Sequence, residues 1–353
     1  MEKRAESRLG SLLAEHVREG SLYEKTDGGW VRCFACGHRC KIAPGKDGIC
    51  RVRFNEGGIL KVPFGYVGGL AIDPVEKKPF FHVLPGSHAL SFGMLGCDYR
   101  CGYCQNWITS QALRDPGAVA PIEYMTAGEI VSLALQRHIP IITSTYNEPL
   151  ITSEWAVEVF SAARPHGIRC SFVSNGNGTE EVLNYLRPYL DFYKVDLKSF
   201  RQKNYQQLGG RLDIVLRTIE SLHAMGVWVE IVTLVVPGFN DTDEELSDIA
   251  RFICSVSPNI PWHVTAFHQD YRMTDHDPTP VRSLLRSAEI GRNAGLHFVY
   301  AGNLPGRVGR WENTYCTVCG ELLVERSGYT ILGNSIKNAS CPKCHSTVPG
   351  IWQ

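Results

Sequence analysis

Short apolar runs alternate with amphipathic stretches between about residues 89 and 305, and this alternation constrains the fold more than any other feature. The runs read as strands buried on both faces, which predicts parallel pairing with helices outside. The class is therefore α/β, and about six units suit a partial TIM-like (β/α) barrel better than a doubly wound sheet. The expected strands are ALSFGML, IPIITSTY, IRCSFVS, DFYKVDL, VWVEIVTLVV, WHVTAF and LHFVY, and the expected helices cover 126–138, 153–164, 179–188, 212–225, 243–256 and 279–294.

Polar or glycine-rich segments follow several of the expected strands. They are GCDYRCGYC, NEP, NGNG and PGFND. In a β/α barrel the loops after the strands converge on one face, which is where active sites are found. The sequence therefore predicts a site built from these four segments.

The remaining chain divides into an N-terminal part and a tail. Residues 1–27 carry a charged amphipathic pattern that predicts a helix and lacks the apolar core of a secretion signal. We expect a Cys-rich module and lead-in at 28–88, the β/α barrel at 89–305, and a four-Cys knob at 306–353. The knob resembles a zinc ribbon or rubredoxin, because two CxxC pairs flank the β-like segment ELLVERSGYTIL.

Thirteen cysteines are too many for a cytosolic protein that uses thiols only as small core residues. Cys170 and Cys254 stand alone in apolar stretches and read as core residues. The other eleven form three tight groups, as expected for metal or cluster binding. These are Cys33, Cys36, Cys40 and Cys50; Cys97, Cys101 and Cys104; and Cys316, Cys319, Cys341 and Cys344.

The central group, CxxxCxxC, is the most informative, because a structural zinc site uses four protein ligands and this loop offers three. A 4Fe–4S cube held by Cys97, Cys101 and Cys104 has one iron without a protein ligand, free to bind a substrate or cosubstrate. The alternative is a zinc loop that takes its fourth ligand from elsewhere in the chain. Tyr103 before the third cysteine, and the position after the first core strand, favour the cluster.

This loop resembles the cluster loop of the radical S-adenosylmethionine (SAM) superfamily. Within it, the chain is similar to the pyruvate formate-lyase activating enzyme group, and especially to the radical SAM enzymes of the AmmeMemoRadiSam system. The resembling stretches span nearly the whole chain: CFACGHRCKIAPGKDGICRVR, DPVEKKPFFHVLPGS, GCDYRCGYCQNW, TYNEP, KVDLKSF, VVPGFND, WHVTAFHQDYRM, TYCTVCGELLVERSGY and CPKCHSTVPGIW.

The resemblance implies that the open iron chelates SAM and that one electron cleaves it to methionine and a 5′-deoxyadenosyl radical, which abstracts hydrogen from substrate. Relatives hold the SAM amino group with a Gly-Gly-Glu-Pro loop, whereas this chain has Tyr146-Asn147-Glu148-Pro149, which keeps the carboxylate without the glycines. The implied cofactor-binding residues are Tyr103, Asn147, Glu148, Ser174, Asn175, Asp196, Lys198 and His263.

Several further residues have two readings. His263, His268, Asp270 and Tyr271 either contact substrate or only cap the barrel mouth. Lys77 and Lys78 either meet an anionic group or are solvated. The C-terminal four cysteines predict Zn²⁺ or a single Fe. The N-terminal four predict zinc or an auxiliary Fe–S cluster, with His38 as a candidate replacement ligand.

The primary functional prediction is an oxygen-sensitive radical SAM enzyme whose substrate, protein or small molecule, is unidentified. One alternative is a glycyl-radical-enzyme activase, and another is a non-catalytic zinc-binding adaptor. We expect a one-electron donor such as flavodoxin or ferredoxin. The equal numbers of acidic and basic residues, 36 each, disfavour nucleic acid, and the lack of any run of 18 apolar residues disfavours a membrane span, so the expected location is cytoplasmic.

Overall fold

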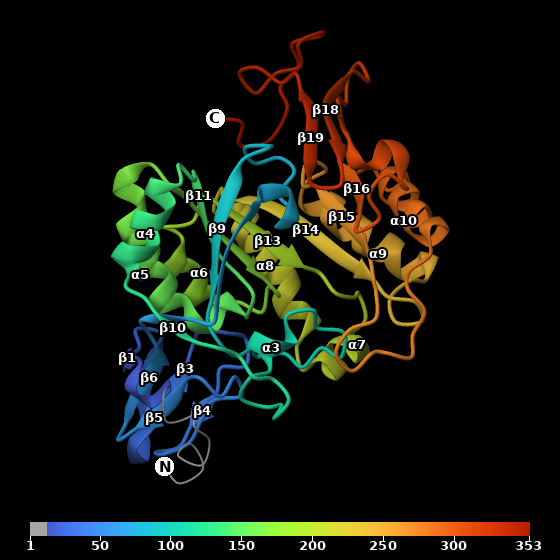
Figure 1. The fold of residues 1–353 in the computed structure, drawn as a ribbon. Helices are drawn as coiled ribbons and strands as arrows, with labels where there is room; N and C mark the ends of the chain where they lie inside the picture. The colour runs from blue at the N-terminus through green and yellow to red at the C-terminus, as the bar shows by residue number, and fades with distance from the viewer. Residues whose placement is uncertain (1–12) are drawn as a thin grey trace.

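The computed structural model describes residues 13–353, which are built around an eight-stranded sheet (Figure 1). Seven neighbouring strands run parallel, and β8 pairs antiparallel with β9 at one edge. The strands, in spatial order, are β8 (Gly69–Pro74), β9 (His88–Gly93), β11 (Ile141–Ser144), β12 (Arg169–Ser174), β13 (Phe192–Asp196), β14 (Trp228–Val235), β15 (Trp262–Ala266) and β16 (Val299–Gly302). In this described part β16 does not pair with β8, so the sheet is open.

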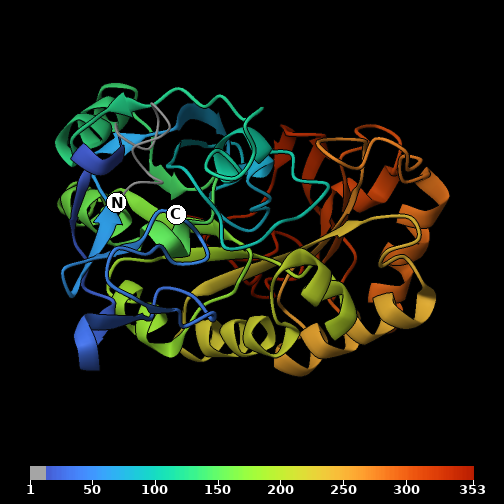
Figure 2. The same cartoon turned by 90° about the horizontal axis from the view of Figure 1, so that it is seen from below.

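Helices connect the parallel strands and cover the outer side of the sheet (Figures 1 and 2). They are α4 (Ala127–Gln136), α5 (Ser153–Ala163), α6 (Glu180–Leu186), α7 (Gln202–Leu208), α8 (Leu212–Ala224), α9 (Asp243–Val256) and α10 (Val281–Asn293). In α9, for example, Thr242 caps the N-terminus and Leu246, Ile249 and Ile253 are buried at helical spacing. The six predicted helices are confirmed to within about two residues at each end, while α7 was not predicted.

The N-terminal residues form small antiparallel sheets. One contains β1 (Val17–Glu19), β6 (Ile59–Pro63) and β5 (Phe54–Glu56); the second contains β2 (Tyr23–Thr26), β3 (Trp30–Cys33) and β4 (Lys41–Ile42); and β7 (Tyr66–Val67) pairs with β10 (Glu123–Tyr124). The helix predicted over residues 1–27 is therefore wrong for 17–26, and its residues 1–12 lie outside the described residues. The partners of β1 lie over 40 residues away in sequence, so local periodicity carries no signal of this pairing.

The C-terminal residues form the antiparallel sheet β17 (Thr314–Tyr315), β18 (Leu322–Ser327) and β19 (Thr330–Asn334). This sheet lies near the amino ends of the parallel strands, where the Arg326 guanidinium donates to the carbonyl of Phe81, 2.8 Å away. The N-terminal sheets lie at the opposite, carboxyl ends, where the Gly37 amide donates to the carbonyl of Asn177 just after β12. Figure 1 shows the two terminal regions below and above the main sheet.

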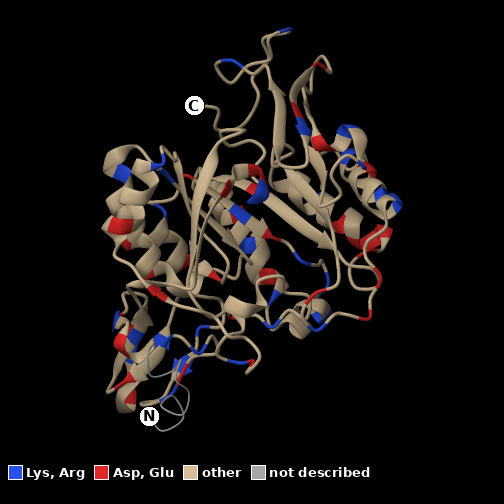
Figure 3. Cartoon of the chain, viewed as in Figure 1, with Lys and Arg blue, Asp and Glu red and all other residues tan. Residues whose placement is uncertain are grey.

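Lys and Arg positions and Asp and Glu positions both occur over the helices in the view of Figure 3, which agrees with the balanced composition. Across residues 13–353, the helices are all too short or too polar to cross a lipid bilayer.

Candidate active site

The loop after β9 presents the three central cysteines to an internal cavity. Gly96 (φ +93°) starts the loop, and a Cβ there would lie 2.8 Å from Cγ1 of Val52, so only glycine fits without movement. The Tyr99 amide donates to Sγ of Cys97 at 3.3 Å, and Cys104 Sγ lies 3.2 Å from the Ser110 hydroxyl at the end of α3 (Trp107–Ser110). Tertiary packing therefore sets the shape of this loop.

All three central thiols line one cavity of about 370 Å³. In the described chain, the four C-terminal sulfur atoms all lie within 4.8 Å of one another, whereas the three of this loop do not all do so. Four thiolates on one zinc ion lie about 3.8 Å apart, as Zn–S bonds of about 2.3 Å require. A 4Fe–4S cube places each thiolate on a different iron, so wider spacing is expected there. The arrangement of Cys97, Cys101 and Cys104 therefore fits a cluster and not a single ion.

Burial keeps these thiols neutral until a metal displaces their protons. It raises the pKa of Cys97 well above the usual thiol value, aided by the charge of Asp98. Burial likewise raises the pKa of Cys101 to about 12, although the nearby Lys198 ammonium opposes the shift. Iron binding supplies the positive charge that makes deprotonation favourable, so cluster assembly and thiolate formation are coupled.

Glu148 lies beside the cluster loop and is held by three donors. Its carboxylate accepts from the Ser174 hydroxyl at 2.6 Å, the Asn175 amide at 2.8 Å and the Leu150 amide at 3.1 Å. Burial, together with the charge of Asp98, raises its pKa to about 8. Three of the predicted cofactor residues thus meet at one point, where a cationic ligand would favour the ionised carboxylate.

Asp98, which sequence reasoning did not single out, orients the loop after β12. Its two carboxylate oxygens accept from the side-chain amides of Asn175 and Asn177, each at 2.7 Å. Asn175 is therefore tied to the cysteine loop as well as to Glu148. The only sequence signal was the position of Asp98 directly after Cys97, and an acid in a loop is too common to carry a role by itself.

Asp196 forms ion pairs with two lysines at the end of β13. The Lys198 ammonium lies 3.1 Å from one oxygen of Asp196, and the Lys194 ammonium contacts the other. Burial alone would raise the pKa of Asp196, yet the two ammonium groups outweigh it and lower the pKa to about 2. Lys194 was not predicted, although its spacing of two residues from Asp196 places both on the same face of the strand.

Tyr146 keeps the backbone conformation expected of the glycine that it replaces. Its φ of +68° lies in the left-handed region, which costs a residue with a side chain on the order of 1 kcal/mol. Its hydroxyl donates to Asp73 at 2.8 Å and accepts from Lys78 at 3.0 Å. The next residue, Asn147, accepts from the Met94 amide through its side-chain oxygen at 3.0 Å. These contacts hold the loop in the shape that glycine would otherwise permit.

His263 lies at the other end of the cavity from the cysteine loop. It is the second residue of β15, and its Nε2 lies 2.7 Å from the Glu230 carboxylate. Glu230 also accepts from the Trp228 ring and from the amides of Phe81 and His82. Burial lowers the pKa of His263 despite this carboxylate. The structure therefore places His263 in the same cavity as the cysteine loop and near Lys194, and its role in cofactor binding stays a prediction.

The segment after β15 covers the cysteine loop from outside. His268 Nε2 lies 2.9 Å from the Gln105 side chain, and the Arg272 amide donates to the carbonyl of Gly102 at 2.9 Å. Tyr271 stacks on Trp107 and donates to Asp115 at 2.7 Å. His268 and Tyr271 thus contact the residues around the cysteine loop, and the choice between substrate contact and capping of the barrel mouth stays a prediction.

The floor of the cavity is formed by segments outside the parallel strands. Glu76, Lys77, Lys78 and Phe81 come from the connection between β8 and β9, and Tyr329 comes from the β18–β19 turn. Gly328 in that turn lies close to Pro305, just beyond β16. The C-terminal hairpin therefore reaches the side where the sheet is open.

The C-terminal cysteines form a compact group suited to one ion. All four sulfur atoms lie within 4.8 Å of one another. Cys316 and Cys344 are 3.6 Å apart, and Cys319 and Cys341 are 3.7 Å apart. These separations match a tetrahedron of thiolates around Zn²⁺ or a single Fe, and four protein ligands leave no position for substrate.

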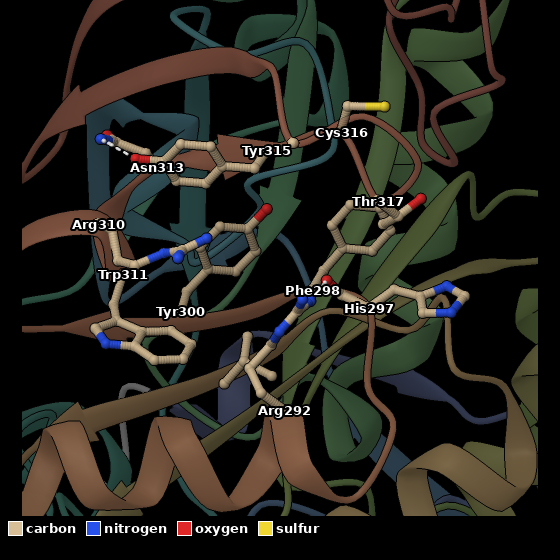
Figure 4. Close-up of a pocket in the computed structure, with 12 residues that line it drawn as sticks. Arg292, His297, Phe298, Tyr300, Arg310, Trp311, Asn313, Tyr315, Cys316 and Thr317 are labelled. Atoms are coloured by element: carbon tan, nitrogen blue, oxygen red, sulfur yellow. Dashed lines mark hydrogen bonds between the residues drawn. The ribbon is translucent and has the colours of Figure 1, made fainter. Parts of the chain in front are cut away.

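A separate hollow of about 180 Å³ lies between this group and the outer side of β16 (Figure 4). Arg292 and Arg310 border it together with Trp311, Tyr300 and Tyr315. Arg310 lies 4.9 Å from the ring of Tyr315, and Arg292 donates to the carbonyl of His297. Its cations are thus already engaged by the protein, and it is not part of the cavity that the cysteine loop lines.

Comparison with known proteins finds a family model that matches part of the chain and relatives that match part or nearly all of it. The model of the radical SAM superfamily matches residues 93–253. An uncharacterized protein of Methanocaldococcus jannaschii is 37% identical, covering 93% of this chain and 98% of that protein. The 4-hydroxyphenylacetate decarboxylase activating enzyme of Clostridioides difficile (strain 630) is 33% identical over 32% of this chain and 36% of that enzyme. A solved radical SAM methyltransferase from Sphaerobacter thermophilus is 14% identical over 89% of this chain and 84% of that one, with a TM-score of 0.49.

The matched domain begins at the last residue of β9 and contains the whole cysteine loop, Glu148 and Asp196. The activating enzyme is matched over about a third of its length, so its own substrate says nothing direct about this chain. The alternative of a non-catalytic zinc adaptor is not supported. The matched domain and the activating-enzyme relatives show that this chain is an enzyme of the radical SAM superfamily.

Proposed function

We propose that this enzyme cleaves SAM reductively at a 4Fe–4S cluster on Cys97, Cys101 and Cys104 and abstracts hydrogen from a substrate held deeper in the same cavity. The observation that carries the proposal is the single cavity that has the three thiols at one end and His263 at the other. Its lining comes from five consecutive strands, β12 to β16, which supports a sheet that curves as a partial barrel around the reactants.

When bound, the cluster with SAM would supply the electron and the 5′-deoxyadenosyl radical. The chain's own residues would then position SAM and the substrate and shield them from water. Glu148 would accept the SAM ammonium, since its three donors hold the carboxylate in place. Asn175 would be oriented by Asp98, and the segment that carries Tyr271 would exclude water from the loop.

The lysines of the cavity support a substrate that carries an anionic group. Four lysines share two aspartates, which leaves a positive surplus near the floor; Lys77 and Lys78 contact Asp73, and Lys194 and Lys198 contact Asp196. Burial raises the pKa of Glu76 and Glu148, and it also lowers the pKa of Lys78 and Lys194. Lys198, whose pKa Asp196 raises against the effect of burial, is therefore the main cation of this surplus. His263 would add a neutral hydrogen-bonding group beside them.

The reaction class is tested by anaerobic reconstitution with iron and sulfide, reduction with dithionite in the presence of SAM, and quantification of 5′-deoxyadenosine. We expect product from the wild type and none from the Cys97/Cys101/Cys104→Ala variant. Cys254→Ala is the matched control, because this half-buried thiol on α9 belongs to none of the three groups. A fully loaded wild type that yields no 5′-deoxyadenosine would contradict the proposal.

The substrate class is tested with metabolite extracts fractionated by charge. The fraction that increases 5′-deoxyadenosine formation should be retained on an anion exchanger. Stimulation confined to the unretained fraction would contradict an anionic substrate.

The second candidate is activation of a glycyl-radical enzyme, favoured by the similarity to activating enzymes. Its signature is a glycyl radical in EPR that appears only when a partner protein is present. Turnover of a small molecule without any partner would count against it. For either candidate we propose a flavodoxin or ferredoxin as electron donor and the cytoplasm as the location, since a reducing compartment keeps the thirteen free thiols available for metals.

A further inference from the structure

The N-terminal cysteines are gathered by one hairpin and the loop that follows it. Cys33 ends β3 and its amide donates to the carbonyl of Cys40 at 3.0 Å, so the two cysteines face each other across the turn that contains Cys36. The Ile49 amide donates to Sγ of Cys40 at 3.5 Å, which brings the adjacent Cys50 to the same place. Cys33, Cys36 and Cys50 are buried, and Cys40 is partly buried. The four thiols therefore share one interior site.

The spacing of these thiols differs from that of a single-ion site. Cys36 and Cys50 lie in one buried apolar cluster with Val52 and Ile151. Nevertheless, in the described chain no three of the four N-terminal thiols lie within 4.8 Å of one another, as the C-terminal four do. A zinc ion with bonds of about 2.3 Å needs the closer packing, whereas a cube with one iron for each thiolate needs the wider.

The site adjoins the loop that carries Cys97. The carbonyl oxygen of Cys50 lies 3.2 Å from where a Cβ of Gly96 would be, so the two cysteine segments are packed backbone to backbone. Arg114 joins them, because its guanidinium donates to the carbonyls of Ile49 at 2.5 Å and Tyr99 at 2.8 Å.

A third contact ties the N-terminal turn to the SAM end of the cavity. The Gly37 amide, next to Cys36, donates to the carbonyl of Asn177 at 2.8 Å. Asn177 in turn donates through its side chain to Asp98, the neighbour of Cys97. The N-terminal cysteines and the central cysteine loop are thus linked by two separate sets of contacts.

Buried cations balance the charge that a cluster would bring. Arg53 is 1% exposed, and its guanidinium forms a buried ion pair with Glu154, whose charge raises the pKa of Arg53 against the effect of burial. The guanidinium of Arg114 experiences the charges of both Cys97 and Cys50. Four thiolates on a 4Fe–4S cube leave a net negative charge, so two guanidinium groups beside the site would stabilise it and tune its potential.

We propose that Cys33, Cys36, Cys40 and Cys50 hold an auxiliary 4Fe–4S cluster that passes electrons to the cluster on Cys97, Cys101 and Cys104. The inference rests on the proposed function for the identity of the acceptor. One electron leaves a reduced flavin or iron–sulfur protein, reaches the auxiliary cluster and moves on to the SAM-binding cluster. No bond forms or breaks in the relay, and the donor is oxidised by one electron.

The experiment uses the full-length Cys97/Cys101/Cys104→Ala variant, reconstituted anaerobically with iron and sulfide. About four iron and four acid-labile sulfide should remain in each chain, because the second cube has its own four thiolates. After reduction this variant should show an EPR signal that SAM does not change. Adding Cys36→Ser and Cys50→Ser to the same variant should remove both the sulfide and the signal, while Cys254→Ala should remove neither.

Two results would overturn the site: zinc without sulfide in the triple variant, or sulfide that survives the further loss of Cys36 and Cys50. If the triple variant does not fold, Mössbauer spectra of the wild type decide the matter, since SAM binds only the open iron and should perturb about one in eight of the cluster irons when two cubes are present. Perturbation of about one in four, as in a single cube, would refute a second cluster.

The relay is tested by comparing the reduced wild type with the triple variant. A neighbouring reduced cluster should broaden the EPR signal of the auxiliary cluster in the wild type alone, and identical line shapes would overturn electron exchange. These readouts are distinct from SAM cleavage. A wild type that holds both clusters but forms no 5′-deoxyadenosine would refute the proposed function and leave the auxiliary site standing.

Discussion

The N-terminal and C-terminal regions each contain four cysteines, yet the structure arranges them differently. The C-terminal thiols converge to separations near 3.6 Å at the amino ends of the parallel strands. The N-terminal thiols are more widely spaced and lie at the carboxyl ends, in contact with the loop that carries Cys97. Equal numbers of ligands therefore do not imply equal sites, because spacing determines what can bind and position determines what the bound group can reach.

The comparison also separates two structural roles. The C-terminal hairpin covers the open side of the sheet and supplies Tyr329 to the cavity floor. The N-terminal hairpin packs against the loop where SAM chemistry is proposed. We therefore expect damage at the N-terminal group to affect the cluster chemistry, and damage at the C-terminal group to affect mainly local stability.

The largest difference, in metal and sulfide content, is expected from replacing two cysteines in the N-terminal group and two in the C-terminal group. Cys36→Ser/Cys50→Ser should lose about four acid-labile sulfides per chain. Cys319→Ser/Cys341→Ser should lose one metal ion and no sulfide, because one ion is held by all four thiolates. Metal and sulfide analysis of the two variants checks this. Loss of sulfide from the C-terminal variant, or of zinc from the N-terminal one, would reverse the assignment of the two groups.

Glu148→Gln tests the carboxyl-end chemistry itself. Losing a charged hydrogen-bond acceptor for the SAM ammonium should reduce 5′-deoxyadenosine formation about tenfold to 100-fold. Ser174→Ala is the companion variant and should reduce the rate less, since it removes one donor to Glu148 and keeps the carboxylate. Equal rates in Glu148→Gln and the wild type would show that this carboxylate does not bind SAM.

The same substitution has a pH signature. The folded protein holds the pKa of Glu148 at about 8, above the 4.5 of an unfolded chain, because burial favours the neutral acid. The resulting stabilisation is complete below pH 4.5 and is lost as the pH rises to about 8. Glu148→Gln should therefore gain thermal stability relative to the wild type over that range. Parallel Tm profiles of the two proteins from pH 5 to 8 would contradict the shift.

Gly96→Ala tests the close contact between the N-terminal group and the cysteine loop. The new Cβ would meet Val52 at 2.8 Å and would force a side chain into φ +93°. We expect the free energy of unfolding to fall by about 3 kcal/mol. Gly226→Ala is matched in φ, at +77°, but has open space around it, so it should cost about 1 kcal/mol. Equal losses in urea denaturation would show that the contact is not tight.

Arg326→Met tests whether a change in the C-terminal region affects SAM cleavage less than a change in the N-terminal region. Arg326 donates to Thr314 and to the carbonyl of Phe81, each at 2.8 Å, and lies 4.3 Å from the Phe81 ring. Methionine keeps the packing but removes both hydrogen bonds and leaves the Phe81 carbonyl without this donor, while Thr314 keeps its contact with Tyr300, so the change should cost about 1–2 kcal/mol of stability. The yield of 5′-deoxyadenosine without substrate should remain as in the wild type. A tenfold decrease would show that this end of the molecule does govern SAM cleavage.

Much of the fold could be predicted because its signals are local. Buried parallel strands read as apolar runs, and α9 has a threonine cap and apolar residues at helical spacing. The strands β1 and β2 could not be predicted, since their partners β6 and β3 determine them and the local pattern resembles a helix. The sequence likewise did not show where strand pairing in the sheet ends, so it could not decide between a partial and a complete barrel.

The sequence also predicted several residues of the candidate site, but it did not predict the residues that hydrogen-bond to them. Cys97, Glu148 and Asp196 follow strands in motifs with specific spacing. Glu230, in contrast, looks like an isolated acid in an apolar strand, and its role becomes visible only when His263 and the 81–82 amides meet it. Hydrogen bonds between distant segments depend on the folded path of the chain.

The sequence by itself determined the chemistry that is available, because the cysteine loops, the acidic residues after strands and the alternating pattern are properties of residue type and spacing. Only the tertiary structure decided which thiols converge within 4.8 Å and which do not, and which group of four lies beside Cys97. The physical reason is that ligand geometry depends on the three-dimensional positions of sulfur atoms, and packing between segments remote in sequence sets those positions.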